Sequence, residues 1–171
     1  EQLLDTGGGI KRAASLFNRQ LPVLIHNVDI LSNVDLAAFY RHALEIKADA
    51  LLLVSRRVTQ RYLIFDSNMR LVGWTNVATG EVKSPHDEIR QLHFVSPTEA
   101  ESSYFQHSCY LCAFSGIHVL APSAVQAVEA VDEDKFPIME FYLNNCDRLD
   151  IRGELKTDLH LLDVGKLNSL Q

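Results

Sequence analysis

The sequence has no long apolar run, no stripe of basic residues and few cysteines. No apolar run approaches the roughly 20 residues that cross a bilayer, and the first residues do not form a signal peptide, so no membrane association is expected. A formal net charge of -6 and an isoelectric point near 5.6 argue against a nucleic-acid surface. The three cysteines, an odd number, indicate a reduced, cytoplasmic setting.

Several catalytic motifs are also missing. The seven histidines form no H-x-x-x-H or H-E-x-x-H pair, and His26, His118 and His160 lie in predicted strands, where core or edge positions are expected. No nucleophile elbow surrounds Ser115, and no Walker lysine-hydroxyl pair is present. Because no basic stripe exists, a phosphate ligand would have to be held by a metal ion or by a few local cations.

The composition, 47% hydrophobic and 22% charged over 171 residues, is that of one globular domain. Periodicity predicts alternating helices and strands, with a turn over residues 6–9 and a loop over 76–87. Ser32 or Asn33 is the expected cap of the second helix. The predicted helices cover residues 10–20, 34–49, 122–131, 136–146 and, at the end, 165–171; the predicted strands cover 21–27, 50–55, two segments within 61–75, 91–96, 109–120, 149–155 and 159–164. This order favours a largely parallel α/β sheet with helices on both faces.

The chain opens on "EQLLDTGGGIKRAASLF", a glycine cluster before a helix. In nucleotide-binding βα units such a cluster follows a strand, and none precedes it here, so an N-terminally incomplete domain is expected. The glycines could bring the backbone close to a base or a phosphate at a helix N-terminus. Their spacing matches neither G-x-G-x-x-G nor a Walker motif, and a plain flexible turn is the alternative.

Polar residues follow three of the predicted strands, where ligands collect in α/β sheets. Asn27 and Asp29 end the first strand on one face, Ser115 and Gly116 interrupt a later one, and Asp163 ends the last. Mg²⁺ in proteins takes one or two carboxylates together with phosphate and water. The two aspartates therefore make a plausible magnesium site, although each is separately explained as a turn residue or, for Asp163, a helix cap.

Three further residues have less specific interpretations. Cys109 and Cys112 lie three apart in a predicted strand and so face opposite sides, which suits core packing better than a shared metal or a disulfide. Trp74, the single tryptophan, could stack on a ring or fill a half-buried structural position.

Read in order, the segments "LLDTGGGIKRA", "LIHNVDIL", "LVGWTN", "FSGIHVLAP" and "LLDVGKLNSL" resemble the sugar-1-phosphate nucleotidyltransferases. These enzymes join an NTP and a sugar 1-phosphate to give an NDP-sugar and pyrophosphate. The resemblance covers essentially the whole chain and is greatest to the branch with mannose-1-phosphate guanylyltransferases and N-acetylmuramate-1-phosphate uridylyltransferases. It implies a Rossmann-like α/β domain with a mostly parallel mixed sheet.

The resemblance also implies roles for individual residues. Asp29 and Asp163 fall on the two Mg²⁺ ligands of the family and are the expected catalytic pair. The expected nucleotide-binding residues are Gly7, Gly8 and Asn27, and the expected sugar-binding residues are Gly73, Trp74, Ser115 and Gly116.

One departure from the family is large. The glycine-rich G-x-G-T-R-L loop and the P-K pair that grip the triphosphate are not in this sequence. Residues 1–171 are therefore expected to form a partial nucleotidyltransferase domain with the sugar- and metal-binding portion, inactive alone and prone to self-association through an exposed sheet edge.

Two other functions stay open from the sequence. One is a non-catalytic module of the same fold that binds a nucleotide-sugar or sugar phosphate, and the paired aspartates favour the enzyme over it. The other is a redox protein using Cys109 and Cys112, which the apolar strand pattern disfavours. The sequence identifies neither the sugar nor the base.

Overall fold

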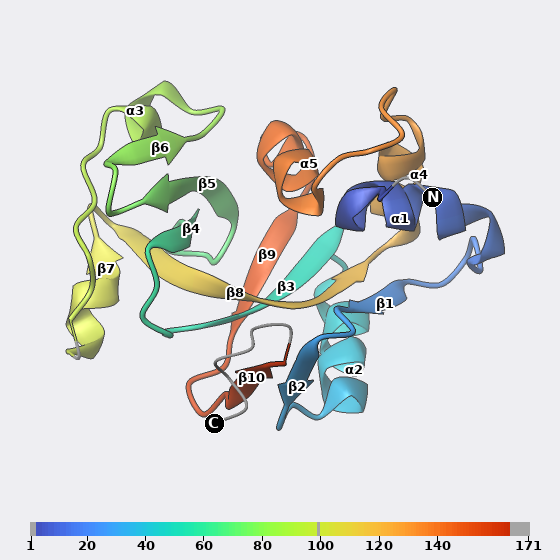
Figure 1. Ribbon diagram of the computed structural model, residues 1–171, viewed down its shortest axis with the longest axis horizontal. Helices are drawn as coiled ribbons and strands as arrows, with labels where there is room; N and C mark the ends of the chain where they lie inside the picture. Colours follow the sequence, from blue (N-terminus) through green and yellow to red (C-terminus); the bar gives the residue numbers. More distant parts are fainter. Residues whose placement is uncertain (1–2, 99, 165–171) are drawn as a thin grey trace.

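Strand β8 (Cys109–Leu120) is the centre of the sheet, and four other strands pair with it, all antiparallel (Figure 1). The structure is a computed structural model, which describes residues 3–98 and 100–164. The strands run in the order β6-β5-β4-β8-β3-β9, with β1 and β7 also on β8, and β2 pairs with β10 in a small second sheet. The other strands are β1 Val23–His26, β2 Ile30–Ser32, β3 Ala50–Ser55, β4 Arg61–Phe65, β5 Leu71–Asn76, β6 Glu81–Lys83, β7 Phe105–Gln106, β9 Ile151–Leu155 and β10 Leu161–Asp163.

The α/β class, the mixed sheet and the helices on both faces are confirmed, but most of the strand pairs are antiparallel. Among the described strands only β3 and β9 pair in parallel. The physical reason lies before β8, which follows β7 through a two-residue turn instead of a helix. His107 and Ser108 have φ values of 53° and 62°, as a tight hairpin requires. Strands β1 and β3 both oppose β8, so their carboxyl ends point to the same edge of the sheet.

Helices cover the two faces of the sheet unequally (Figure 1). Helix α2 (Leu36–Ile46) packs its Phe39 with Leu51 and Leu53 on one face. The opposite face, with Leu52, carries α1 (Asp5–Ala13), α4 (Pro122–Glu129) and α5 (Ile138–Asn145). The aliphatic run of β3 is buried throughout, as expected of a strand covered on both sides. Short helical turns complete the described chain: η1 Ala14–Leu16, α3 Asp87–Arg90 and η2 Glu101–Tyr104.

The "TGGG" segment was predicted as a turn, and that prediction is wrong, because Gly7, Gly8 and Gly9 lie inside α1. The backbone N–H groups of Gly7 and Gly8 donate to the carbonyl of Phe136 at 3.0 and 3.2 Å. A Cβ on Gly8 would lie 2.2 Å from the Asp134 carbonyl oxygen. The glycines therefore allow a close approach between two backbone segments that overrides their low helix propensity.

Three further boundaries differ from expectation. Asp35, not Ser32 or Asn33, caps α2, and its carboxylate accepts from Ala38 N at 2.9 Å. Residues 91–96 are irregular, because buried Phe94 packs under the β4–β5 surface without joining the sheet. The predicted loop 76–87 contains β6. The helix predicted over 165–171 lies outside the described residues.

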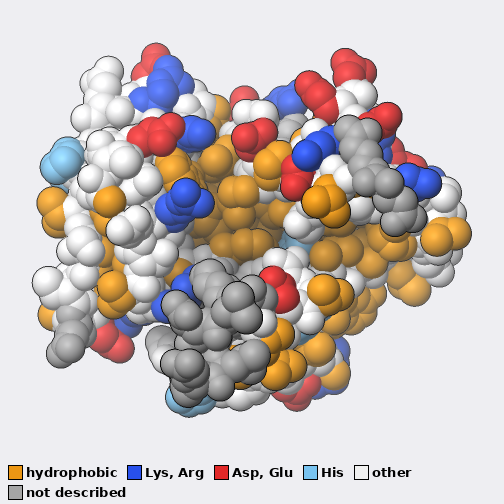
Figure 2. Space-filling view, viewed as in Figure 1, with side chains coloured by type: hydrophobic (Ala, Val, Ile, Leu, Met, Phe, Trp, Pro, Cys, Tyr) orange, Lys and Arg blue, Asp and Glu red, His pale blue; other side chains and the backbone are white. Residues whose placement is uncertain are grey.

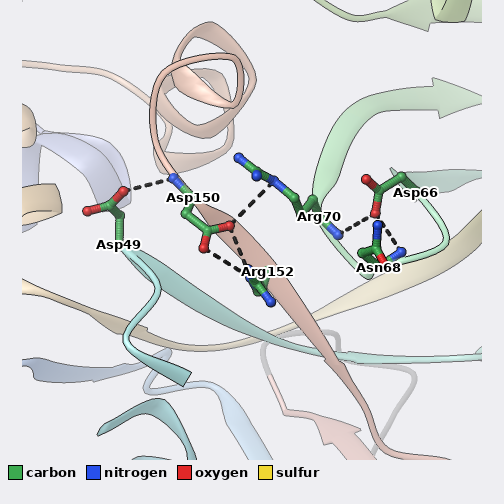
Figure 3. A network of polar contacts seen from close by, with 6 residues as sticks. All are labelled: Asp49, Asp66, Asn68, Arg70, Asp150 and Arg152. Carbon is green, nitrogen blue, oxygen red and sulfur yellow. Dashed lines mark hydrogen bonds and ion pairs between the residues drawn. The ribbon is translucent and has the colours of Figure 1, made fainter. Parts of the chain in front are cut away.

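A polar network joins the amino ends of β3 and β9 (Figure 3). Asp49 accepts a hydrogen bond from the backbone N–H of Asp150 at 2.8 Å. The Asp150 carboxylate accepts from Arg152 Nε at 3.0 Å and lies 3.5 Å from Arg70 Nε, on the β4–β5 turn. Asp66 holds that turn by accepting from the Arg70 N–H at 2.9 Å. The network links the β4–β5 turn to the amino ends of β3 and β9.

None of the described helices combines the length and the apolar character that a membrane-spanning helix needs.

Candidate functional site

The end of β1 is fixed against the middle of β8. Asn27, just beyond β1, donates its backbone N–H to the Gly116 carbonyl at 3.0 Å. Gly116 has a φ of +79°, and a Cβ there would lie 2.8 Å from Asn27 Nδ2. The β3–β8 register shifts at this bulge, between the pairs of Leu52 and Val54. Only glycine combines this backbone conformation with the close Asn27 contact. The structure therefore needs a glycine at position 116, and this glycine lies against Asn27, another of the predicted site residues.

Two predicted metal ligands lie on adjacent backbone segments, although 134 positions separate them. Asp163, the last residue of β10, pairs with Ile30 of β2, and the next residue, Val164, donates its N–H to the Asp29 carbonyl at 2.8 Å. Asp29 is half-buried, and its carboxylate has no hydrogen bond or ion pair within residues 3–98 and 100–164. The side chain of Asp163 is outside what the structure describes, so the shared metal stays a prediction.

The magnesium site stays a prediction, and Asp29 is the one predicted ligand whose side chain the structure describes. No group of three or more histidine, cysteine, aspartate and glutamate side chains in the described part of the chain could hold a metal ion. Magnesium needs fewer protein ligands, because water and substrate phosphate complete its octahedron. One available carboxylate at Asp29, with the backbone of Asp163 beside it, fits that pattern.

A hollow of about 210 Å³ lies beside the Asn27–Gly116 contact. Its lining residues come from β1, β2, β8, β10 and the loop after β3: Asn27, Ile30, Arg57, Phe114, Ser115, Gly116 and Leu161. The side-chain amide of Asn27 makes no hydrogen bond among the described residues and is free for a ligand. The Ser115 hydroxyl instead donates to the Leu53 carbonyl at 2.7 Å, which supports the bulge. A sugar contact by that hydroxyl stays a prediction.

A second hollow, of about 480 Å³, contains Trp74. Phe114 and Arg57 line both hollows, so the two are neighbours, and Met139 and Arg61 line the second one alone. Lys83 lies over the indole of Trp74, with Nζ 5.4 Å from the ring centroid. Figure 2 shows a depression with an apolar floor, and both Lys or Arg and Asp or Glu side chains lie at its margin. An aromatic ring beside cations suits a polar, anionic ligand with one apolar face.

Asp29 and three of the predicted glycines are not among the described residues that line these hollows. Gly73 is buried in β5, where a Cβ would lie 2.7 Å from the Lys83 carbonyl oxygen, so its structural role is close packing of the β5–β6 hairpin. Gly7 and Gly8 are buried against the segment before α5. Sugar binding by Gly73 and nucleotide binding by Gly7 and Gly8 stay predictions.

Sequence reasoning missed Arg57. The available signal was "SRRVTQR", residues 55–61, which puts three arginines within six residues just after an aliphatic strand of an acidic chain. Arg56 pairs with Glu101 at 2.9 Å, whereas Arg57 has no carboxylate partner in the described part of the chain.

The cysteines do not form a redox site. Cys109 and Cys112 are free, buried and belong to different core clusters on opposite sides of β8, as predicted. Burial raises the pKa of the Cys112 thiol to about 12 and also raises the pKa of Cys109. A buried thiol with a raised pKa is a poor nucleophile, so these residues serve the core.

No protein-family model and no curated protein matches this sequence. Solved structures do match the fold. They include a glucose-1-phosphate thymidylyltransferase from Bacillus anthracis, so described and in complex with sucrose (11% identity, TM-score 0.64), and UDP-glucose pyrophosphorylase with UDP-glucose (11%, 0.62). A third is the inositol-1-phosphate CTP transferase from T. maritima (10%, 0.59).

The three matches cover 98 to 100% of this chain but only 58 to 60% of the other chains. This chain thus spans less than two thirds of the length of its structural neighbours. At 10 to 11% identity the likeness establishes the fold, which agrees with the Rossmann-like α/β sheet that the sequence predicted.

Proposed function

We propose that this chain forms the sugar- and metal-binding part of a sugar-1-phosphate nucleotidyltransferase. One observation carries the proposal. Asp29 and Asp163 lie on neighbouring backbone segments beside an Asn27–Gly116 contact, at the carboxyl end of β1. Ligands of α/β sheets collect outside such ends. The solved structures of the same fold are described as a glucose-1-phosphate thymidylyltransferase, a UDP-glucose pyrophosphorylase with UDP-glucose and an inositol-1-phosphate CTP transferase.

The proposed reaction is an in-line displacement. A phosphate oxygen of the sugar 1-phosphate forms a bond to the α-phosphorus of an NTP, and the bond from that phosphorus to the leaving pyrophosphate breaks. Such a reaction needs positioning and charge neutralisation more than covalent help. Mg²⁺, held by Asp29 and Asp163, would supply the neutralising charge.

The chain's own residues would position the sugar phosphate. The free amide of Asn27 is available to hold a phosphate or ribose oxygen beside Gly116, and the Trp74 hollow accommodates a sugar ring. The sequence contains neither G-x-G-T-R-L nor a P-K pair, so the triphosphate clamp would have to come from outside these 171 residues. We therefore expect the 171-residue chain to bind ligand without turnover.

Binding is the direct test. Calorimetric titrations of the 171-residue chain would use glucose 1-phosphate, mannose 1-phosphate and the matching NDP-sugars, each with Mg²⁺ and with EDTA. We expect Mg²⁺-dependent binding. Asp29→Asn should weaken it about tenfold or more, because a charge-assisted metal contact is lost. Asp132→Asn, at an exposed carboxylate between α4 and α5, is the matched control.

The outcomes separate the possible functions. Binding that is strong with EDTA and unchanged in Asp29→Asn would indicate a non-catalytic binding module. Absence of binding to every sugar phosphate and NDP-sugar would contradict the proposal. Pyrophosphate release by the 171-residue chain at a normal rate would show that the triphosphate-binding groups are already in this sequence.

A further inference from the structure

The loop after β3 holds two adjacent arginines in different environments. Arg56 points to Glu101 and forms an ion pair at 2.9 Å. Arg57 has no carboxylate within ion-pair distance in residues 3–98 and 100–164, and its side chain is exposed. The same loop is fixed farther along, where the Thr59 N–H donates to the Tyr62 hydroxyl at 2.9 Å.

Arg57 lies where three hollows meet, because it also lines a hollow of about 720 Å³ together with Arg56. It lines the 210 Å³ hollow with Asn27 and Gly116, and it lines the 480 Å³ hollow with Trp74. A group bound at its guanidinium therefore lies between the Asn27–Gly116 contact and the aromatic hollow.

The charge around Arg57 favours an anion. No aspartate or glutamate is among the described residues that line either hollow, although the protein carries a net charge of -6. Arg61 adds a second cation to the Trp74 hollow. A guanidinium offers a planar pair of donors that matches two phosphate oxygens, and its charge persists at all physiological pH values.

We infer that Arg57 is the phosphate anchor of the site: it binds the phosphomonoester group of the ligand between the Asn27 hollow and the Trp74 hollow. The identity of the attached sugar rests on the proposed function, whereas the anchoring of a phosphate does not. Arg57 thereby makes the site selective for phosphorylated sugars over free sugars.

The test compares ligands and variants. Binding of glucose 1-phosphate, mannose 1-phosphate, the two free sugars and inorganic phosphate would be measured by calorimetry and by ¹H–¹⁵N NMR, with Mg²⁺ present. Arg57→Gln should weaken binding of the sugar phosphates and of phosphate about 10- to 100-fold, as expected for the loss of a charge-assisted pair. Arg57→Lys should recover part of the affinity. Arg41→Gln, at an exposed arginine of α2 on the other face, is the control.

A positioning or structural role of Arg57 would give different affinities and melting temperatures. Equal affinities of wild type, Arg57→Gln and Arg41→Gln for phosphate would overturn the inference, as would a wild type that binds neither phosphate nor sugar phosphate. A melting temperature lowered in Arg57→Gln and in Arg57→Lys alike, with binding lost in both, would also overturn it. Binding of inorganic phosphate that depends on Arg57, without binding of any sugar phosphate, would support the anchor and contradict the proposed function.

Discussion

The amino ends of β3 and β9 and the carboxyl ends of β1 and β3 differ in how their polar groups are used. At the amino ends, Asp49 and Asp150 are engaged in hydrogen bonds and ion pairs with backbone and arginine groups (Figure 3). At the carboxyl ends, Asn27 and Arg57 have no side-chain partner in the described part of the chain, and the buried hydroxyl of Ser55 has none either.

The difference separates structural from functional polar groups. The buried Ser55 hydroxyl and the half-buried Asn27 amide cost free energy without a partner, which a ligand, ion or water can supply, whereas the exposed Arg57 is solvated by water. We therefore expect the network of Asp49, Asp150 and their arginines to serve stability and the carboxyl ends of β1 and β3 to serve ligand binding. Mutations at the amino ends should change the free energy of unfolding. Mutations at the carboxyl ends should change the affinity for ligand.

The largest expected effect concerns Gly8, which is buried against the segment before α5 and is expected to serve stability. Gly8→Ala should lower the free energy of unfolding by about 3 kcal/mol, because the Asp134 carbonyl lies where the Cβ must go. Gly9→Ala, where a Cβ meets nothing within 4 Å, should raise it by about 0.5 to 1 kcal/mol. Urea denaturation of both variants measures this. Equal stabilities would assign the glycines to ligand binding instead of packing.

Gly116→Ala should lower both the free energy of unfolding and the affinity for ligand. Strain at φ +79° and displacement of Asn27 together should cost about 2 kcal/mol, and sugar-phosphate affinity should fall about tenfold. Gly80→Ala is the matched control, because Gly80 has φ +76° with open space around it. That control should cost only about 1 kcal/mol and leave affinity unchanged. Loss of affinity in both variants would contradict a specific role of the Asn27–Gly116 contact in ligand binding.

The pH dependence of stability should report on His118, a core residue of β8. Burial lowers its pKa to about 3, so the unfolded chain binds a proton that the folded chain excludes between pH 6.5 and pH 3. Stability is therefore lost as the pH falls through 6.5. Between pH 7.5 and 5.5 wild type should lose about 1.4 kcal/mol more than His118→Gln, a variant that keeps a hydrogen-bonding group near Tyr142. Parallel stability curves for the two proteins would contradict this.

The smallest expected effect lies in the network of Asp49 and Asp150. Asp150→Asn keeps the backbone contact with Asp49 but removes the charge opposite Arg70 and Arg152. These pairs are partly exposed, so the cost should be about 0.5 to 1 kcal/mol at low salt and less at 1 M NaCl. Ligand affinity should not change. A tenfold loss of affinity in Asp150→Asn would contradict the assignment of this network to stability alone.

Patterns with a single physical explanation were predicted well. The aliphatic run of residues 50–55 had to be a covered strand, and it is buried throughout. Cys109 and Cys112 had to face opposite sides of their strand, and they do. The glycine cluster has two explanations, a turn or a close-packed helix, and the choice depends on Phe136, which is distant in the sequence.

The sequence alone determined the alternation of helices and strands, the burial of the aliphatic strands and the placement of Asn27 and Asp29 after β1, because these follow from local periodicity and turn chemistry. Only the tertiary structure decided that β8 runs between β1 and β3 in the opposite direction and that Gly116 contacts Asn27. It also decided that the Asp163 backbone lies beside Asp29 and that Arg57 lines neighbouring hollows. Those facts depend on strand pairing between distant segments, and a sequence read locally does not specify which segments pair.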